Sequence, residues 1–238
     1  MIIQYYKKLG ETMGELLARF KLEYLLDINK VAFAGRLDPL ACGIVTMLTD
    51  TDIYAKDNYC ARSKIYECNI IEGICTDTYD IMGICTISSN SFNPIFNSVA
   101  NIKYIQEYPP YSSQLVTDIT GTKRPLWVCT KNNIKYIDTP TKNITLHEGK
   151  QLSSYQIDKD ELNDLIKNRI NLVKSQTFRQ DMILESWDKL LSLDYFNDNN
   201  LITIGKWQFT ISSGGYIRYL GNKMNGSCFD IERISYIE

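Results

Sequence analysis

Three short blocks of this sequence carry side chains that could do chemistry together. The first holds the carboxylate of Asp38, the second the phenol of Tyr66, and the third the guanidinium of Arg218. An ionised carboxylate can act as a nucleophile or stabilise a developing positive charge, and a nearby guanidinium favours the ionised form. An aromatic ring offers a face on which a planar base can stack. The carboxylate and the guanidinium are therefore suited to nucleophilic or charge-stabilising chemistry.

Asp38 also has a purely structural interpretation. Pro39 disfavours the helical conformation at Asp38, while proline itself suits the first turn of a helix. The Asp-Pro pair therefore predicts a helix over residues 40–48, with the Asp38 carboxylate accepting hydrogen bonds from free backbone N–H groups as an N-cap. Because a helix start is also a rigid place to hold a reactive carboxylate, the capping and catalytic interpretations can both hold.

The other two blocks have structural interpretations as well. Tyr66 could be an aromatic residue that packs across neighbouring strands, and Asp77 and Asp80 could be turn residues whose carboxylates hold backbone N–H groups. Arg218 follows two glycines that permit a tight turn before a helix, so it could be an ordinary surface arginine. Each block alone leaves both interpretations open.

Together, however, the blocks resemble a known family. Gly35-Arg-Leu-Asp-Pro-Leu-Ala-Cys-Gly43 is similar to the G-x-L-D-P-x-A-x-G signature of the TruB family of tRNA pseudouridine synthases. The strand Lys64-Ile-Tyr66 and the loop Thr76-Asp-Thr-Tyr-Asp-Ile-Met-Gly83 resemble the family's K-x-Y and T-D-T-x-D-x-x-G elements at matching separation. Ser212-Ser-Gly-Gly-Tyr-Ile-Arg-Tyr-Leu220 resembles S-S-G-T-Y-I-R-S-L. The resemblance extends over nearly the whole chain.

The resemblance implies a role for each residue of the site. Asp38 would be the essential aspartate and Arg218 the arginine that pairs with it. Tyr66 would stack on an extruded uracil and stand near its C5 atom as the proton acceptor. Four further residues are expected to shape the pocket around the uracil: Gly35, Asp80, Tyr216 and Ile231.

The positions expected to face RNA match the family less well. The turn at residues 7–13 keeps the family's lysine and glycine but lacks its proline and serine. Phe33 stands where bacterial relatives carry a histidine; an aromatic ring could still stack, but a polar contact to RNA is lost. Residues 108–113 and 121–127 match the family's P-P-x-Y-S-A and N-G-K-R-x-Y-E-L segments imperfectly. Three basic residues are predicted to touch RNA phosphates: Lys7, Lys123 and Arg124.

The composition narrows the classes of protein. A net charge of −2 argues mildly against a nucleic-acid partner, so RNA binding requires that the basic residues cluster on one face. No apolar run is long enough for a membrane span and no leader is evident, which predicts a cytoplasmic protein. The seven cysteines form no C-x-x-C pair and the chain has one histidine, His147, so we expect reduced cysteines and no metal. His147 lies in a predicted strand end, as a solvated edge residue.

The predicted fold is α+β: a mixed, largely antiparallel sheet flanked by helices, with a central RNA-binding cleft. We expect one catalytic domain over residues 1–238, without the C-terminal RNA-binding domain of many bacterial relatives. A polar connection is expected at 53–59. Strands are predicted at 2–6, 64–73, 84–87, 142–146, 152–157 and 202–212, and helices after Thr12, at 40–48, 95–102, 160–172 and 178–192, and after Gly215.

The predicted function is isomerisation of uridine to pseudouridine in a structured RNA, through base flipping and an aspartate nucleophile. The resemblance points to the tRNA T-loop, a U55-type site. The reaction consumes no carrier, so we expect no cofactor, and we expect a monomer. Two alternatives stay open: a non-catalytic RNA-binding or RNA-folding protein on the same scaffold, and a synthase that borrows RNA affinity from a partner. A pure binder would not need Asp38, Tyr66 and Arg218 together.

Overall fold

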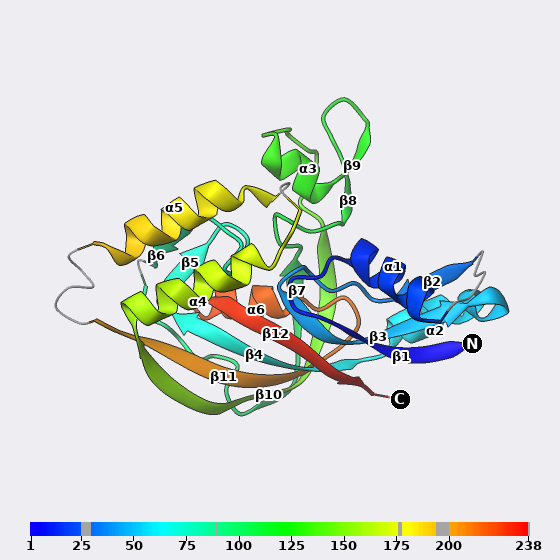
Figure 1. The fold of residues 1–238 in the computed structure, drawn as a ribbon, viewed down its shortest axis with the longest axis horizontal. Helices are drawn as coiled ribbons and strands as arrows, with labels where there is room; N and C mark the ends of the chain where they lie inside the picture. Colours follow the sequence, from blue (N-terminus) through cyan, green and yellow to red (C-terminus); the bar gives the residue numbers. More distant parts are fainter. Residues whose placement is uncertain (25–29, 89, 176–177, 194–199, 238) are drawn as a thin grey trace.

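A computed structural model describes residues 1–24, 30–88, 90–175, 178–193 and 200–237. Within these residues a mixed sheet of eight strands forms the framework (Figure 1). Neighbouring strands are antiparallel except for β12 and β3, which run parallel. The α+β fold with a mixed, largely antiparallel sheet is thus confirmed. In order across the sheet the strands are β1 (Ile2–Lys7), β3 (Ala41–Thr49), β12 (Gly226–Tyr236), β4 (Lys64–Glu72), β11 (Leu201–Ile211), β10 (Thr141–Asp158) and β7 (Val99–Glu107), and β2 (Val31–Ala34) pairs with β3.

Helices and two small hairpins flank the sheet. In Figure 1, α4 and α5 lie together near one end of the molecule, α1 lies at the other, and α3 projects with the second hairpin. The helices are α1 (Met13–Glu23), α2 (Lys56–Ala61), α3 (Leu126–Lys131), α4 (Lys159–Asn171), α5 (Gln180–Leu191) and α6 (Ile217–Lys223), with a 3-10 turn at Asp50–Ala55. The hairpins pair β5 (Ile74–Thr76) with β6 (Cys85–Ile87) and β8 (Leu115–Thr117) with β9 (Lys123–Pro125).

Two hydrophobic clusters hold these layers together. One lies around α1 and α6 and includes the fully buried Trp207. The other lies beneath α4 and α5 and includes the fully buried Trp187. The indole N–H of Trp187 donates to the carbonyl of Ile81 at 3.1 Å, which ties α5 to the loop that carries Asp80. The second cluster therefore fixes a loop that reaches the site.

Several predicted elements are confirmed. Thr12 caps α1 through a capping box: the Glu15 N–H donates to Thr12 Oγ1 at 3.2 Å and the Thr12 N–H donates to Glu15 Oε2 at 2.7 Å. The strands near 2–6, 64–73 and 202–212 and the helices near 160–172 and 178–192 also form. His147 lies on β10, half-buried, with its Nε2 atom 3.0 Å from Ser63 Oγ. No helix among the described residues is long and apolar enough to cross a bilayer.

The helix predicted over 40–48 is wrong, because this segment is strand β3. Its backbone groups are satisfied by pairing with β1 on one side and with β2 and β12 on the other. The run Ile44-Val45-Thr46 is β-branched, which suits a pleated strand better than a helix. Asp38 therefore caps no helix; its carbonyl accepts from the Ala41 N–H at 3.0 Å in a tight turn.

Other local differences have similar causes. The short helix predicted at 95–102 is wrong, since residues 99–107 form edge strand β7 paired with β10. The strands predicted at 142–146 and 152–157 are one long strand, β10, and its register shifts between Leu146 and Glu148 and between Gln151 and Ser153. The polar connection at 53–59 takes in the end of the 3-10 turn and the start of α2.

Candidate active site

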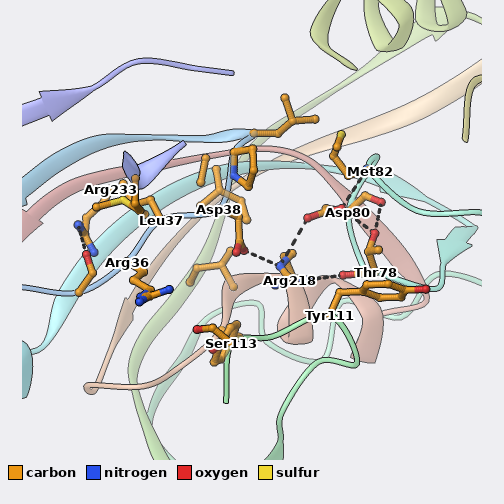
Figure 2. Close-up of a pocket in the computed structure, with 18 of the residues that line it drawn as sticks. Arg36, Leu37, Asp38, Thr78, Asp80, Met82, Tyr111, Ser113, Arg218 and Arg233 are labelled. Atoms are coloured by element: carbon orange, nitrogen blue, oxygen red, sulfur yellow. Dashed lines mark hydrogen bonds and ion pairs between the residues drawn. The ribbon is translucent and has the colours of Figure 1, made fainter. Parts of the chain in front are cut away.

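Asp38, Tyr66 and Arg218 line one cavity of about 620 Å³. Asp38 comes from the turn between β2 and β3, Tyr66 from the start of β4, and Arg218 from the first turn of α6. Figure 2 shows the Arg218 guanidinium between the carboxylates of Asp38 and Asp80. The three separated blocks of sequence thus meet at one place.

The turn that presents Asp38 is held from beneath. The Gly10 N–H donates to the carbonyl of Pro39 at 2.9 Å. Lys7 Nζ donates to the carbonyls of Lys8 and Pro39, each at 3.2 Å, and of Ala41 at 2.6 Å. The Lys7 side chain is fully buried, and burial lowers its pKa to about 8. Lys7 does not line the cavity, and in this structure it fixes the turn; its predicted contact with phosphate stays a prediction.

Arg218 links two carboxylates. Its Nε atom lies 2.8 Å from Asp38 Oδ2 and 3.5 Å from Asp80 Oδ2, and its Nη1 group donates to the carbonyl of Thr78. The Nε–H group is not aligned as a hydrogen bond to either carboxylate, so both contacts are ion pairs. Burial favours the neutral form of Arg218, but Asp38 and Asp80 raise its pKa above the usual value. The guanidinium therefore stays charged behind Asp38.

Exposure separates the two carboxylates. The Asp38 side chain is 42% exposed and faces the cavity, whereas that of Asp80 is 12% exposed. Asp80 Oδ1 accepts from Thr78 Oγ1 at 2.7 Å and from the Met82 N–H at 3.0 Å, so Asp80 also holds its own loop. Burial raises the pKa of Asp80 to about 6, against the opposing effect of Arg218. Asp38 is thus the carboxylate that a ligand can reach.

Tyr66 forms part of the cavity wall beside a second arginine. Its side chain is buried, and burial raises the pKa of the phenol, while the charge of Arg233 and a hydrogen bond with it act in the opposite direction. At neutral pH the ring is therefore a neutral phenol. Arg233 is itself buried and donates to the carbonyls of Ile44 and Gly35.

The structure brings most of the other predicted residues to the cavity, but not all. Gly35, Asp80, Tyr216 and Ile231 line it. Lys123 and Arg124 do not line it: they lie on β9, where Arg124 Nε pairs with Asp118 Oδ2 at 2.7 Å. The cavity residues from this part of the chain are instead Trp127 and Lys131 of α3.

The cavity wall is basic although the whole chain is slightly acidic. Among the described residues that line it, six are Lys or Arg and two are Asp. Clustering of basic residues on one face, which RNA binding required, is therefore present. Sequence reasoning did not assign five of these cations to the site, although Arg36 lies inside the aspartate block and Lys64 two residues before Tyr66. The six are Arg36, Lys64, Lys131, Arg179, Arg218 and Arg233.

Arg36 and Arg179 make aromatic contacts at the cavity. The Arg36 guanidinium lies 5.9 Å from the centre of the Phe33 ring. Phe33, which stands where bacterial relatives carry a histidine, therefore contacts a cation three residues further along the chain. The Arg179 guanidinium lies 4.4 Å from the centre of the Tyr111 ring, and Nη1 pairs with Asp77 Oδ2 at 3.0 Å. No group of three or more His, Cys, Asp or Glu side chains in the described ranges could hold a metal ion.

Comparison with known proteins identifies the family. A family model described as TruB family pseudouridylate synthase (N terminal domain) matches residues 23–163. The chain belongs to the TruB family. It is similar to tRNA pseudouridine synthase B of Mycoplasma mycoides, with 24% identity over 89% of this chain and 65% of that protein. The Mesoplasma florum protein of the same name is 30% identical over 47% of this chain and 41% of its own length.

The alignments cover only part of the length of each matched protein. The Clostridium novyi tRNA pseudouridine synthase B is 33% identical over 34% of this chain and 28% of its own length. The TruB chain described here therefore spans less than two thirds of the curated relatives that it matches. A chain of an archaeal box H/ACA sRNP crystal structure aligns with 99% of this chain and 47% of its own, at 12% identity and a TM-score of 0.48.

Proposed function

We propose that this protein is a pseudouridine synthase that converts uridine to pseudouridine in tRNA, with the T-loop as its target. Family membership supports the reaction class, and the names of the curated relatives support tRNA as the substrate. The observation that carries the proposal is the ion pair of Arg218 with an accessible Asp38 in the wall of a basic cavity.

The substrate base has to leave its stack to reach this site. Extrusion of a nucleotide costs a few kcal/mol, which contacts in the pocket must return. The cavity volume of about 620 Å³ provides room for a base and its ribose. Tyr66 and Tyr216 offer aromatic surface, and the cations of the wall suit the phosphates on either side of the base.

The isomerisation needs a group that attacks or stabilises the sugar when the glycosidic bond breaks. The bond from uracil N1 to ribose C1′ breaks, the base turns, and a bond from C5 to C1′ forms; C5 loses a proton and N1 gains one. Asp38 is placed to act as the nucleophile or as the anion that stabilises the separated sugar. Arg218 orients the carboxylate from its buried side and leaves the exposed side free to react.

Tyr66 is the proposed acceptor of the C5 proton. Its phenol is neutral, because burial raises its pKa, so the oxygen can take the C5 proton only as its own proton passes to solvent. The uracil N1 takes a proton from solvent in turn, so the proton count balances. Arg233 beside it stabilises negative charge on that oxygen during the transfer. The tyrosine would thus work as a relay rather than as a preformed phenolate.

The test is a search for new pseudouridines in unmodified total RNA. RNA is incubated with the wild-type protein, treated with carbodiimide and read by primer extension. The proposal predicts a new stop at the T-loop uridine of tRNA. Stops at other RNAs only would contradict the T-loop assignment. Tight RNA binding with no new stop would favour the non-catalytic alternative.

A further inference from the structure

Lys64 and Arg233 in the cavity wall, with Lys142 next to it, form a group of three cations that pairs with no carboxylate among the described residues. The side chains of Lys64 and Arg233 line the cavity and are at least nine-tenths buried. Lys142 approaches from β10: a Cβ atom added to Gly214, which also lines the cavity, would lie 2.3 Å from Lys142 Nζ. Among the described residues no Asp or Glu oxygen lies within 4 Å of any of these three cations.

The cations are close enough to repel one another. A Cβ atom added to Gly35 would lie 3.1 Å from Arg233 Nη1 and 3.5 Å from Lys64 Cε, so both side chains meet at this glycine. Burial, Arg233 and Lys142 together lower the pKa of Lys64 to about 8. At neutral pH Lys64 is still mostly protonated, so positive charge is concentrated there.

Among the described residues, the groups that compensate this charge are neutral. Lys64 Nζ donates to the carbonyls of Cys60 at 2.9 Å and Arg62 at 2.6 Å. Arg233 donates to two carbonyls and lies opposite Tyr66 on the neighbouring strand. A buried charge without a counter-ion is costly, and an incoming anion relieves the cost. Arg218 differs, since Asp38 and Asp80 already neutralise it.

We propose that Lys64, Lys142 and Arg233 form an anion subsite that binds a phosphodiester next to the extruded uridine. This assignment rests on the proposed function, because it supplies the ligand from the substrate's own backbone. The subsite adjoins Tyr66, the ring proposed to stack on the base, because Arg233 lies opposite Tyr66 in the sheet and both line the cavity. A phosphodiester held here would place its nucleoside between Tyr66 and Asp38.

The first experiment uses inorganic phosphate as the probe. The melting temperature is measured with phosphate and with sodium chloride at equal ionic strength, for the wild type, Lys142→Gln and Lys103→Gln. Lys142 is only partly buried, so its variant should fold; Lys103 is an exposed lysine of β7 outside the cavity, and its variant is the charge-matched control. Phosphate should stabilise the wild type and the control more than Lys142→Gln. Equal shifts for all three proteins would overturn the subsite.

The second experiment identifies the anion as part of the RNA. T-loop transcripts carry a neutral methylphosphonate at one linkage beside the target uridine, and binding is measured in an Asp38→Asn background with and without Lys142→Gln. Loss of one phosphate contact should weaken binding about tenfold when Lys142 is present and less than twofold when it is replaced. The salt dependence of log Kd should also fall by about 0.7 to 0.9 with Lys142→Gln. The methylphosphonate is placed at the 5′ linkage in one transcript and at the 3′ linkage in another. If each transcript loses as much affinity with Lys142 present as with Lys142→Gln, the assignment is overturned.

The same transcripts separate this inference from the proposed function. Isomerisation of the unmodified transcript by the wild type is scored in parallel. An active wild type without the methylphosphonate coupling contradicts the subsite alone. An inactive wild type that shows the coupling contradicts the synthase proposal and leaves the subsite standing. A wild type that binds no RNA contradicts both.

Discussion

Replacement of Arg218 by methionine should destabilise the protein in a way that depends on pH. The change removes a cation that is 3% exposed and lies 3.5 Å from the buried carboxylate of Asp80. With an effective dielectric constant of 20, that attraction is about 5 kcal/mol, and breaking a buried ion pair usually costs about 3 to 5 kcal/mol. We therefore expect a loss of about 4 kcal/mol at pH 8.

The loss should shrink at lower pH because Asp80 can take up a proton. The pKa of Asp80 is about 6 with Arg218 present, which lowers it, and must rise when Arg218 is removed. Between pH 8 and 6 the folded variant then binds more protons than the folded wild type, so its relative stability rises as the pH falls. One pH unit corresponds to at most about 1.4 kcal/mol, so we expect about 2 kcal/mol of recovery by pH 6.

Urea unfolding followed by fluorescence of the buried Trp187 and Trp207 measures this difference. Arg169→Met is the control, because Arg169 pairs with Asp230 at 3.1 Å at a site where both side chains are more exposed. The control should lose less, with little change between pH 6 and 8. Arg218→Met combined with Asp80→Asn should remove most of the pH dependence. A pH-independent loss for Arg218→Met, or a double variant that keeps the pH dependence of Arg218→Met, would refute this electrostatic account.

Two further predictions follow from the site and its frame. Single-turnover isomerisation should slow as the pH falls through about 6, because a protonated Asp80 leaves Arg218 to neutralise Asp38 alone. Asp80→Asn should react more slowly than the wild type and should lack that inflection in the pH profile. An unchanged inflection in Asp80→Asn would argue against Asp80 as its source. Gly43→Ala should cost more than about 3 kcal/mol in urea unfolding, because φ is +111° and the new Cβ would lie 2.3 Å from the Arg233 carbonyl oxygen in β12. Gly73→Ala, with φ +77° and open space around the new Cβ, is the control and should cost only about 1 kcal/mol; equal losses would contradict the steric argument.

The residues of the site could be predicted from the sequence more completely than the secondary structure that supports them. Asp38, Tyr66 and Arg218 lie in blocks whose order and spacing resemble one family, so they could be named together. The turn at Asp38 could not be read in the same way. Asp-Pro favours a helix start locally, but pairing with three other strands overrides that preference for residues 41–49.

The positions of the charged side chains were the hardest feature to predict from the sequence, because they depend on which face of the fold each side chain reaches. Lys7 looked like a phosphate contact, yet three carbonyls surround its Nζ atom beneath the Asp38 turn. Lys64 and Arg233 were not assigned to the site from the sequence, yet the antiparallel pairing of β4 with β12 brings Arg233 opposite Tyr66 and beside the cavity. A net charge of −2 concealed this local concentration of cations.

Asp38→Asn tests the central claim most directly, because it keeps the shape of the side chain and removes its charge. Pseudouridine formation and RNA binding are both measured on one T-loop transcript, for wild type and variant. The account predicts that Asp38→Asn forms no pseudouridine while binding the transcript within a few fold of the wild type. A variant as active as the wild type would contradict it.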